Sequence, residues 1–283
     1  MIVITGATGQ LGRGVVERLL TRVPADLIGV SVRDASRAGD LARRGVRVRQ
    51  GDFDDPASLA YAFEGATRVL IISGPADARP HRTAIEAATA AGAGRILYTS
   101  HMGANPASPF VPMPGHAETE RDLRACGVPF TSLRNGFYAT TAVHFVTQAL
   151  ETGRLVAPED GPVSWTAHAD LAEAAVVALT EESRLDGITP PLTGPESLDL
   201  ADVAAIASDL TGREITRVTV SDDEWVARMT AHGAPEQQAL FLLGMFEASR
   251  KGEFAEVAPA LGELLGRKPA ALRDVLAAAL ANR

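Results

Sequence analysis

A glycine-rich turn near the start of the chain is the first feature that could do chemistry. Gly6, Gly9 and Gly12 follow the apolar run Ile2–Thr5 and precede a helical pattern. In a strand–turn–helix unit such glycines allow a tight turn and let the backbone approach a pyrophosphate, which the helix N-terminus attracts. The turn predicts a dinucleotide site, with a bare connection as the alternative. Its expected cofactor-binding residues are Gly6, Thr8, Gly9, Gln10, Leu11 and Gly12.

Two arginines follow the second apolar run and bear on which dinucleotide is bound. Arg33 stands where an NAD-preferring site usually has an acidic residue, and Arg37 follows one turn later. A guanidinium matches a 2′-phosphate, so we expect NADP(H) to be preferred over NAD(H). Asp34 could instead accept from a ribose 2′-OH or cap the next helix, and a solvated surface pair is the alternative for the arginines.

The distribution of lysine excludes one common reductase mechanism. A Tyr-x-x-x-Lys pair uses lysine to lower the pKa of a tyrosine that then donates a proton to a carbonyl. The only lysines are Lys251 and Lys268, and Glu247 and Leu264 stand four residues before them. Hydride transfer without this acid remains, and it suits acceptors such as quinones and cationic dyes that need little help from the protein.

The segment between Ser100 and His116 is rich in proline and lacks helical periodicity. A long loop inside a compact domain is usually functional or mobile. Met102, Phe110 and Met113 could form one wall of a pocket for a flat apolar substrate, and His101 could face the same pocket.

Short apolar runs alternate with amphipathic stretches through the first half of the chain. The expected strands are Ile2–Thr5, Leu27–Val32, Val46–Arg49, Val69–Ser73, Ile96–Thr99 and Phe130–Leu133. The expected helices between them are Leu11–Arg22, Pro56–Phe63, Arg82–Ala91 and Ala117–Ala125. Nearly continuous apolar runs are typical of parallel strands buried on both faces. The alternation predicts an α/β fold with a Rossmann-like, doubly wound parallel sheet.

The pattern changes after about Leu150 and becomes mostly helical. Expected elements are helices at Asp170–Thr180, Leu200–Leu210 and Ala270–Ala281, a short strand at Ile215–Val220, and a helix opened by the capping box Ser221–Glu224. We therefore predict a dinucleotide-binding domain over residues 1–150. A smaller lobe over residues 151–283 is expected to lie over the carboxyl edge of the sheet and to interleave with the main domain.

Composition bounds the classes of protein that the chain can belong to. The 283 residues carry a net charge of −8 without a basic stripe, which argues against nucleic-acid binding. No apolar stretch is long enough for a membrane span, and no signal peptide is evident, so the expected location is the cytoplasm. Cys126 is the single cysteine, and no metal-ligand spacing occurs, so we expect no metal. Either a monomer or a homodimer is expected.

Several motifs together resemble the NmrA-like group of the atypical short-chain dehydrogenases/reductases. They are "TGATGQLG", "VRQGDFDDPASL", "VLIISGP", "ILYTS", "HAETE", "LRNGFY", "SRKGE" and "LLGRKP". The resemblance covers nearly the whole chain and is to the branch that holds bacterial NAD(P)H:quinone oxidoreductases and triphenylmethane reductases. The glycine spacing G-x-x-G-x-x-G differs from the G-x-G-x-x-G of ordinary dehydrogenases and agrees with this group.

The resemblance implies further cofactor contacts. Asp52 and Phe53 would lie at the adenine edge, although Asp54 or Asp55 could simply cap the helix that begins at Pro56. The turn that follows the fourth strand would lie beside the ribose, or it is a plain turn. The residues implied there and beside the nicotinamide are Ser73, Gly74, Pro75, Ser100, Asn135, Gly136 and Phe137.

Two residues are candidates for catalysis. His116 lies four residues before Glu120 on one helix face, at a position where many NmrA-like proteins have lysine near the nicotinamide ribose. It could donate a hydrogen bond to the ribose, protonate a reduced quinone near neutral pH, or only cap a helix. Tyr138 would stand with Phe137 at the carboxyl edge, where Phe137 can stack on a flat substrate, or both are core aromatic residues.

These features predict an NADPH-dependent reductase that transfers hydride to a quinone or a similar flat acceptor, without flavin or metal. The alternative is an NADP(H)-binding redox sensor that reports to a partner protein, because some NmrA-like proteins behave in that way and a fold does not separate the two. A reductase that tailors an aromatic natural product is a third interpretation. A small aromatic molecule is the expected partner in the first and third cases.

Overall fold

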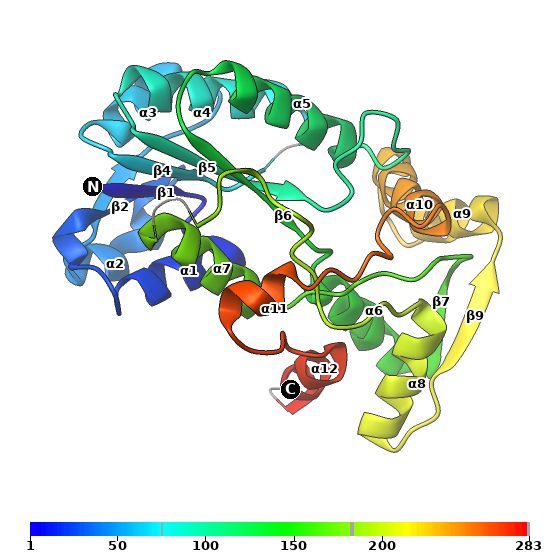
Figure 1. Ribbon diagram of the computed structural model, residues 1–283. Coiled ribbons are helices and arrows are strands. Elements are labelled where there is room, and N and C mark those ends of the chain that lie inside the picture. The colour runs from blue at the N-terminus through cyan, green and yellow to red at the C-terminus, as the bar shows by residue number, and fades with distance from the viewer. Residues whose placement is uncertain (75, 182–183, 282–283) are drawn as a thin grey trace.

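A parallel sheet of seven strands forms the centre of the computed structural model, which describes residues 1–74, 76–181 and 184–281 (Figure 1). The strand order is β3-β2-β1-β4-β5-β6-β8. The bounds are β1 Ile2–Thr5, β2 Ile28–Val32, β3 Arg47–Gln50, β4 Arg68–Ile71, β5 Arg95–His101, β6 Phe130–Asn135 and β8 Gly187–Ile188. Every neighbouring pair of these strands is parallel, which confirms the predicted doubly wound sheet.

Helices cover both faces of the sheet. They are α1 Gln10–Leu19, α2 Gly39–Arg43, α3 Pro56–Phe63, α4 Ala78–Ala90, α5 Pro112–Ala125 and α7 His168–Thr180. Helix α6 Ala139–Thr152 packs instead against the second lobe, described below. Helices α1 and α7 pack together on one face, and α3, α4 and α5 lie side by side on the other. Successive side chains of a strand point to opposite faces of the sheet, so β1 contributes to the core on both faces. Ile2 and Ile4 point to the α1 side and Val3 points to the α3 side.

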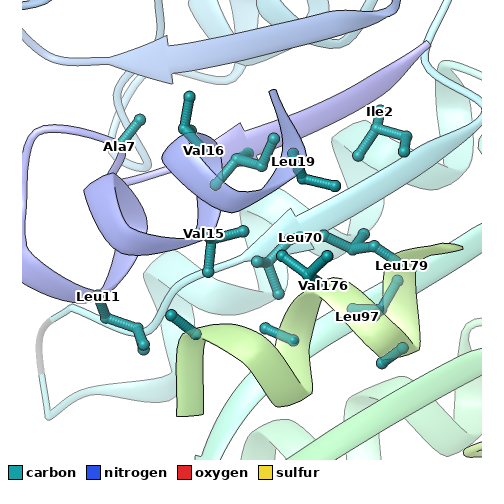
Figure 2. Close-up of a cluster of buried hydrophobic side chains, with 14 of the residues drawn as sticks. Ile2, Ala7, Leu11, Val15, Val16, Leu19, Leu70, Leu97, Val176 and Leu179 are labelled. Carbon is teal, nitrogen blue, oxygen red and sulfur yellow. The ribbon is translucent and has the colours of Figure 1, made fainter. Parts of the chain in front are cut away.

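The core between α1, α7 and the sheet is made of aliphatic side chains (Figure 2). Leu11, Val15 and Leu19 recur along one face of α1 and are at most 5% exposed. They face α7 across the close-up, with Leu70 and Leu97 of the sheet beside them. Burial of such side chains stabilises the fold by about 1.5–3 kcal/mol each, which holds the turn before α1 in a fixed place.

The second lobe contains a small sheet and five helices among the described residues. Strands β7 Arg154–Pro158 and β9 Thr216–Val220 pair in parallel. The helices are α8 Leu200–Thr211, α9 Asp222–Ala231, α10 Glu236–Arg250, α11 Ala260–Leu265 and α12 Leu272–Ala281. Helix α7 and strand β8 also follow residue 150, yet they belong to the layers of the main sheet. The boundary at residue 150 and the interleaving of the lobe with the main domain stay predictions.

Local chemistry explains where two of the predicted helices begin. Asp55 caps α3 by accepting from the amides of Ala57 and Ser58, with Pro56 in the first turn. The side chain of Ser221 accepts from the amide of Glu224 and begins α9. Both predicted N-caps are confirmed, although at Ser221 only the serine half of the predicted capping box is formed among the described contacts.

One predicted loop is shorter than expected, and two strands were missed. Helix α5 begins at Pro112, so the expectation of an irregular segment as far as His116 was wrong. Prolines in a first helical turn lose nothing, because the amides there have no partner within the helix. Strand β7 lies in a segment that we assigned no element, and β8 has only two residues, too few for a recognisable period.

Candidate functional site at the carboxyl edge of the sheet

The candidate residues gather because parallel strands end at one edge of the sheet. Strands β1, β4, β5 and β6 are neighbours and run in the same direction. Their carboxyl ends lead to the glycine turn, to Ser73, to His101 and to Asn135. Open α/β sheets bind ligands outside this edge, where the strand order reverses.

The glycine turn has the backbone that its sequence predicted. Gly6 adopts a left-handed conformation with φ +61°, and its carbonyl accepts from the amide of Gly9 at 3.0 Å. A Cβ on Gly12 would lie 2.8 Å from the carbonyl carbon of Gly6, so the turn admits no side chain there. Leu11 is buried in the core, and therefore only its backbone can reach a ligand.

The N-terminus of α1 is open to an anion. Its N-cap Gly9 provides no side-chain cap, and the first turn holds no acidic residue. Gly6, Gly9 and Gln10 are exposed, and Thr8 is half-buried. The first amides of a helix lack partners within it and carry partial positive charge, so this end suits a phosphate group.

The end of β2 presents two unengaged guanidinium groups. Arg33 and Arg37 are exposed, and neither guanidinium forms a hydrogen bond or an ion pair within the described part of the chain. Asp34 accepts from the amide and the hydroxyl of Ser36, at 3.0 and 2.6 Å, and these bonds keep the pKa of its carboxyl below the usual value. The helix-capping interpretation of Asp34 is confirmed, which leaves the arginines as the free charged groups of this turn.

Asp52 and Phe53 lie in the turn after β3. The carboxylate of Asp52 accepts from the amide of Asp54 at 3.1 Å, and the amide of Asp52 is bonded to Ser58. The ring of Phe53 is half-buried and lies edge-on to His81 at 6.2 Å. The cap of α3 is Asp55, so Asp52 takes no part in starting that helix.

The turn after β4 is anchored through its backbone. The amide of Ser73 donates to the hydroxyl of Thr99 at 2.8 Å, and the amide of Gly74 donates to Nε2 of His81 at 3.2 Å. A Cβ on Gly74 would meet no atom within 4 Å, so open space borders this residue. Pro75, the third residue predicted here, lies outside the described residues.

A row of ring side chains runs from the inside of the sheet to its carboxyl edge. The phenol oxygen of Tyr98 lies 2.7 Å from Nδ1 of His116 and 3.4 Å from Nδ1 of His81. The ring of His116 stacks on that of His101 at 6.2 Å between centroids. His81 and Tyr98 are fully buried, while His101 and His116 are half-buried.

Burial sets the protonation of this row. It lowers the pKa of His81 to about 4 and that of His101 to about 3. Burial, together with the neighbouring histidines, holds the pKa of His116 well below its usual value. Desolvation disfavours a charged imidazole, so all three rings are neutral near neutral pH. The lowered pKa of His116 therefore favours a role as a neutral hydrogen-bond donor. It disfavours a role as an acid that protonates a reduced quinone near neutral pH.

Glu120 is a buried carboxylate that joins α5 to the sheet. Ser100 and Ser132 donate their hydroxyls to its Oε1 at 2.8 and 3.2 Å, and Arg134 donates from two nitrogens. Ser100, predicted to contact the cofactor, thus has its hydroxyl committed to Glu120. This network fixes the helix that carries His116 against the ends of β5 and β6.

An aromatic cluster lies beside the row of histidines. Phe137 lies 5.3 Å from His101 and 5.0 Å from Phe254, and Phe110 is stacked on Phe137 at 6.2 Å. Phe110 also contacts Phe241 of α10 at 5.3 Å. Met102 and Met113 belong to the same buried cluster. That these side chains form one wall of a substrate pocket stays a prediction. Phe254 and Phe241 were missed, although Phe254 directly follows the quoted motif "SRKGE".

The segment after β6 carries the remaining predicted residues. Asn135 is 1% exposed, and its side-chain oxygen has no hydrogen-bond partner among the described residues. Gly136 leaves no room for a Cβ, which would lie 3.0 Å from the carbonyl oxygen of Leu192. Tyr138 packs its ring on His168 at 4.2 Å, and burial raises the pKa of its phenol. Sequence reasoning gave His168 no role, since it matches no motif.

The described residues contain no group of three or more histidine, cysteine, aspartate or glutamate side chains that could hold a metal ion. None of the helices in residues 1–74, 76–181 and 184–281 is long and apolar enough to cross a membrane.

The NmrA-like family model matches residues 1–274. The chain belongs to the NmrA-like family. It is 35% identical over 278 residues to quinone oxidoreductase 2 of Escherichia coli, a match that covers 97% of this chain and 96% of that protein. It is 30% identical over 270 residues to the NAD(P)H azoreductase of Xenophilus azovorans, covering 94% and 93% of the two chains.

Solved structures of similar proteins agree with the fold. The structure of the E. coli NADPH-dependent quinone oxidoreductase QOR2 in complex with NADPH superposes with a TM-score of 0.93 at 34% identity, over 99% of this chain and 100% of that one. The Citrobacter triphenylmethane reductase in complex with NADP(H) gives 0.92 at 33% identity, with the same coverage. The resemblance seen in the motifs and the Rossmann-like architecture are thereby confirmed.

Proposed function

We propose that the protein is an NADPH-dependent oxidoreductase that transfers hydride to a quinone or a similar flat acceptor, without flavin or metal. The observation that carries the proposal is the aromatic cluster around Phe137, which borders the same edge of the sheet as the glycine turn. The named activities of the E. coli and Citrobacter relatives support it. A small aromatic molecule is its partner, and the cytoplasm is its proposed location.

The residues at the edge fit a reduced dinucleotide. The uncapped N-terminus of α1 would hold the pyrophosphate, and Arg33 would pair with a 2′-phosphate. The buried oxygen of Asn135 needs a donor, which the carboxamide of a nicotinamide offers. When bound, the reduced nicotinamide supplies the hydride. Complexes of two relatives with NADPH and NADP(H) support the same cofactor.

The protein's own part in the reaction is orientation and exclusion of water. Phe137 and Phe110, which are each 8% exposed, form the buried aromatic layer against which a flat acceptor would lie, close to Asn135. His116 acts as a neutral hydrogen-bond donor to the acceptor, and Tyr138 lines the site against His168. An acceptor that takes hydride readily needs no stronger acid, in agreement with the missing Tyr-x-x-x-Lys pair.

The test is oxidation of NADPH and of NADH by the purified protein with a panel of quinones, corrected for the uncatalysed rate. Saturable turnover that depends on both NADPH and the quinone is the expected result. Tight binding of NADPH without turnover of any acceptor would contradict the proposal and would point to a redox-sensing regulator instead.

A further inference from the structure

His101 and His116 form a stacked pair whose ring nitrogens can be assigned. The rings lie 6.2 Å apart between centroids with an interplanar angle of 27°. His101 ends β5 and His116 lies in the second turn of α5, so the two rings come from elements that the Glu120 network holds together. Sequence alone gave His101 no defined role.

The tautomer of His101 follows from one backbone bond. The amide of Gly103 donates to Nδ1 of His101 at 3.0 Å. A ring nitrogen that accepts a hydrogen bond carries no proton, so in the neutral ring the proton is on Nε2. Gly103 has no room for a side chain, because a Cβ there would lie 2.8 Å from the ring of Phe254, so this amide is held in place.

The tautomer of His116 follows from a chain of bonds that starts at the backbone. The amide of Gly74 donates to Nε2 of His81, so His81 carries its proton on Nδ1 and donates it to the hydroxyl of Thr119 at 3.1 Å. The hydroxyl of Thr119 donates its own hydrogen bond to the carbonyl of Gly115 at 2.9 Å. His81 thus offers the buried phenol of Tyr98 no acceptor.

The hydroxyl of Thr119 is the other acceptor near the phenol of Tyr98. Nδ1 of His116 is the nearest one, at 2.7 Å, and we assign the phenol proton to this bond. The proton of the neutral His116 ring is then on Nε2, on the side away from Tyr98. Nε2 of His116 has no hydrogen-bond partner among the described residues. It is not fully buried, so a ligand can reach it. Tyr98 is a positioning residue, because it acts through His116.

We propose that His101 and His116 form an oxyanion site, in which two neutral imidazoles direct their Nε2–H groups at the oxygen that becomes negative when the acceptor takes hydride. This inference rests on the proposed function and adds His101 as a catalytic residue. The ring centroids are 6.2 Å apart. One oxygen that accepts from two nitrogens at about 2.9 Å joins donors up to about 5.8 Å apart, so Nε2 atoms on facing edges of the two rings would both reach it. A neutral imidazole is a suitable donor to such an oxygen, as in known isomerase chemistry.

The reaction balances without a proton from either ring. The C–H bond of the reduced dinucleotide breaks, and its hydrogen, with two electrons, forms an O–H bond at one quinone oxygen. The displaced electron pair moves through the ring to the other oxygen, which becomes the anion, and the dinucleotide is oxidised. The product is the hydroquinone monoanion, held by the two N–H groups. Its second proton comes from water after release, so the imidazoles stay neutral throughout.

The kinetic test uses His101→Phe, which keeps a ring against Phe137 and Phe254 but removes the N–H donor. A dimethyl- and a dichloro-benzoquinone of the same substitution pattern serve as acceptors, because they are alike in size while the dichloro product is the more acidic. The control is His144→Phe, an exposed histidine of α6. We expect His101→Phe to lower kcat/KM for the dimethyl quinone about tenfold or more, and less for the dichloro quinone, whose anion needs less stabilisation. The affinity of His101→Phe for NADPH should equal that of the wild type. The control His144→Phe should keep the wild-type kcat/KM for both quinones.

Equal losses for the two quinones would indicate a packing defect and would overturn the oxyanion site, as would no loss for either. Nitrogen spectra of isotope-labelled histidine in the wild-type protein provide a readout that does not depend on activity. They should show Nε2–H tautomers for His101 and His116, with only His116 changed by Tyr98→Phe. Charged or Nδ1–H rings would overturn the inference even if quinones are reduced, whereas correct tautomers without any quinone turnover would contradict the proposed function.

Discussion

Glu120 and Arg134 are joined by two hydrogen bonds, from Nε of the arginine to Oε1 at 2.9 Å and from Nη2 to Oε2 at 2.7 Å. The carboxylate is 3% exposed and the guanidinium 28%. The pair connects α5, which carries His116, to β6, which leads to Phe137. A planar two-pronged contact of this kind fixes orientation as well as distance, so it positions the two walls of the site relative to each other.

Removal of this carboxylate should be costly. Glu120→Ala leaves Arg134 and two serine hydroxyls without their acceptor, and breaking a buried ion pair in this way costs about 3 kcal/mol. Glu118→Ala, on the same helix, removes only the half-exposed partner of Arg82 and should cost less than about 1 kcal/mol. Urea unfolding of both variants measures the difference. Similar losses would show that the Glu120 network does not hold the site.

Two glycines at the sheet edge should respond differently to the same substitution. Gly74→Ala adds a methyl group into open space, so the variant should fold normally and yet bind NADPH about tenfold more weakly if the cofactor occupies that space. Gly12→Ala would force the turn apart and should lose stability as well as binding. Thermal unfolding and fluorescence titration with NADPH measure the two effects. Gly94→Ala, with an ordinary 3.6 Å contact, is the control. Unchanged NADPH affinity in Gly74→Ala would place the cofactor elsewhere.

Arg33 provides a test of cofactor preference. Arg33→Ala removes an exposed guanidinium without a partner in the described chain, so stability should change by less than about 0.5 kcal/mol. Affinity for NADPH should fall about tenfold or more while affinity for NADH stays the same, because only NADPH carries the 2′-phosphate. Arg213→Ala, an exposed arginine after α8, should affect neither cofactor. If Arg33→Ala lowered the affinities for NADPH and NADH equally, Arg33 would not be the residue that binds the 2′-phosphate.

The buried histidines predict how stability depends on pH. Their folded pKa values, about 4 for His81 and about 3 for His101, lie below the unfolded value of 6.5. The unfolded chain therefore binds more protons below pH 6.5, and the free energy of unfolding falls as pH decreases from there toward about 4. Each neutral histidine contributes a slope of up to about 1.4 kcal/mol per pH unit. Above pH 6.5 these groups contribute no slope.

Urea unfolding across this pH range measures the slope. His101→Phe removes one of the groups and should reduce the fall between pH 6.5 and 4 by about 3 kcal/mol. A slope that is the same in wild type and His101→Phe would mean that His101 titrates normally in the folded protein.

Sequence patterns predicted the main layers of the fold because the signals were local. The runs of valine, isoleucine and leucine marked six parallel strands, and the Asp55–Pro56 pair marked the start of α3. Strand β8 was missed because it has two residues and is held by pairing with β6 rather than by its own pattern. Strand β7 was missed in the same way, since its partner β9 is distant in sequence.

Some features of the candidate site could likewise be predicted from the sequence, and others could not. The glycine turn, the unusual arginines after β2 and the lack of a Tyr-x-x-x-Lys pair are readable from residue types at fixed spacing, and with the family motifs they determined the class of protein by themselves. Only the tertiary structure brought His101 onto His116 and Phe254 against Phe137, because those contacts join segments with no shared period. It also decided the charge of the histidines, since an imidazole responds to the desolvation and the donors around it, which a linear sequence does not contain.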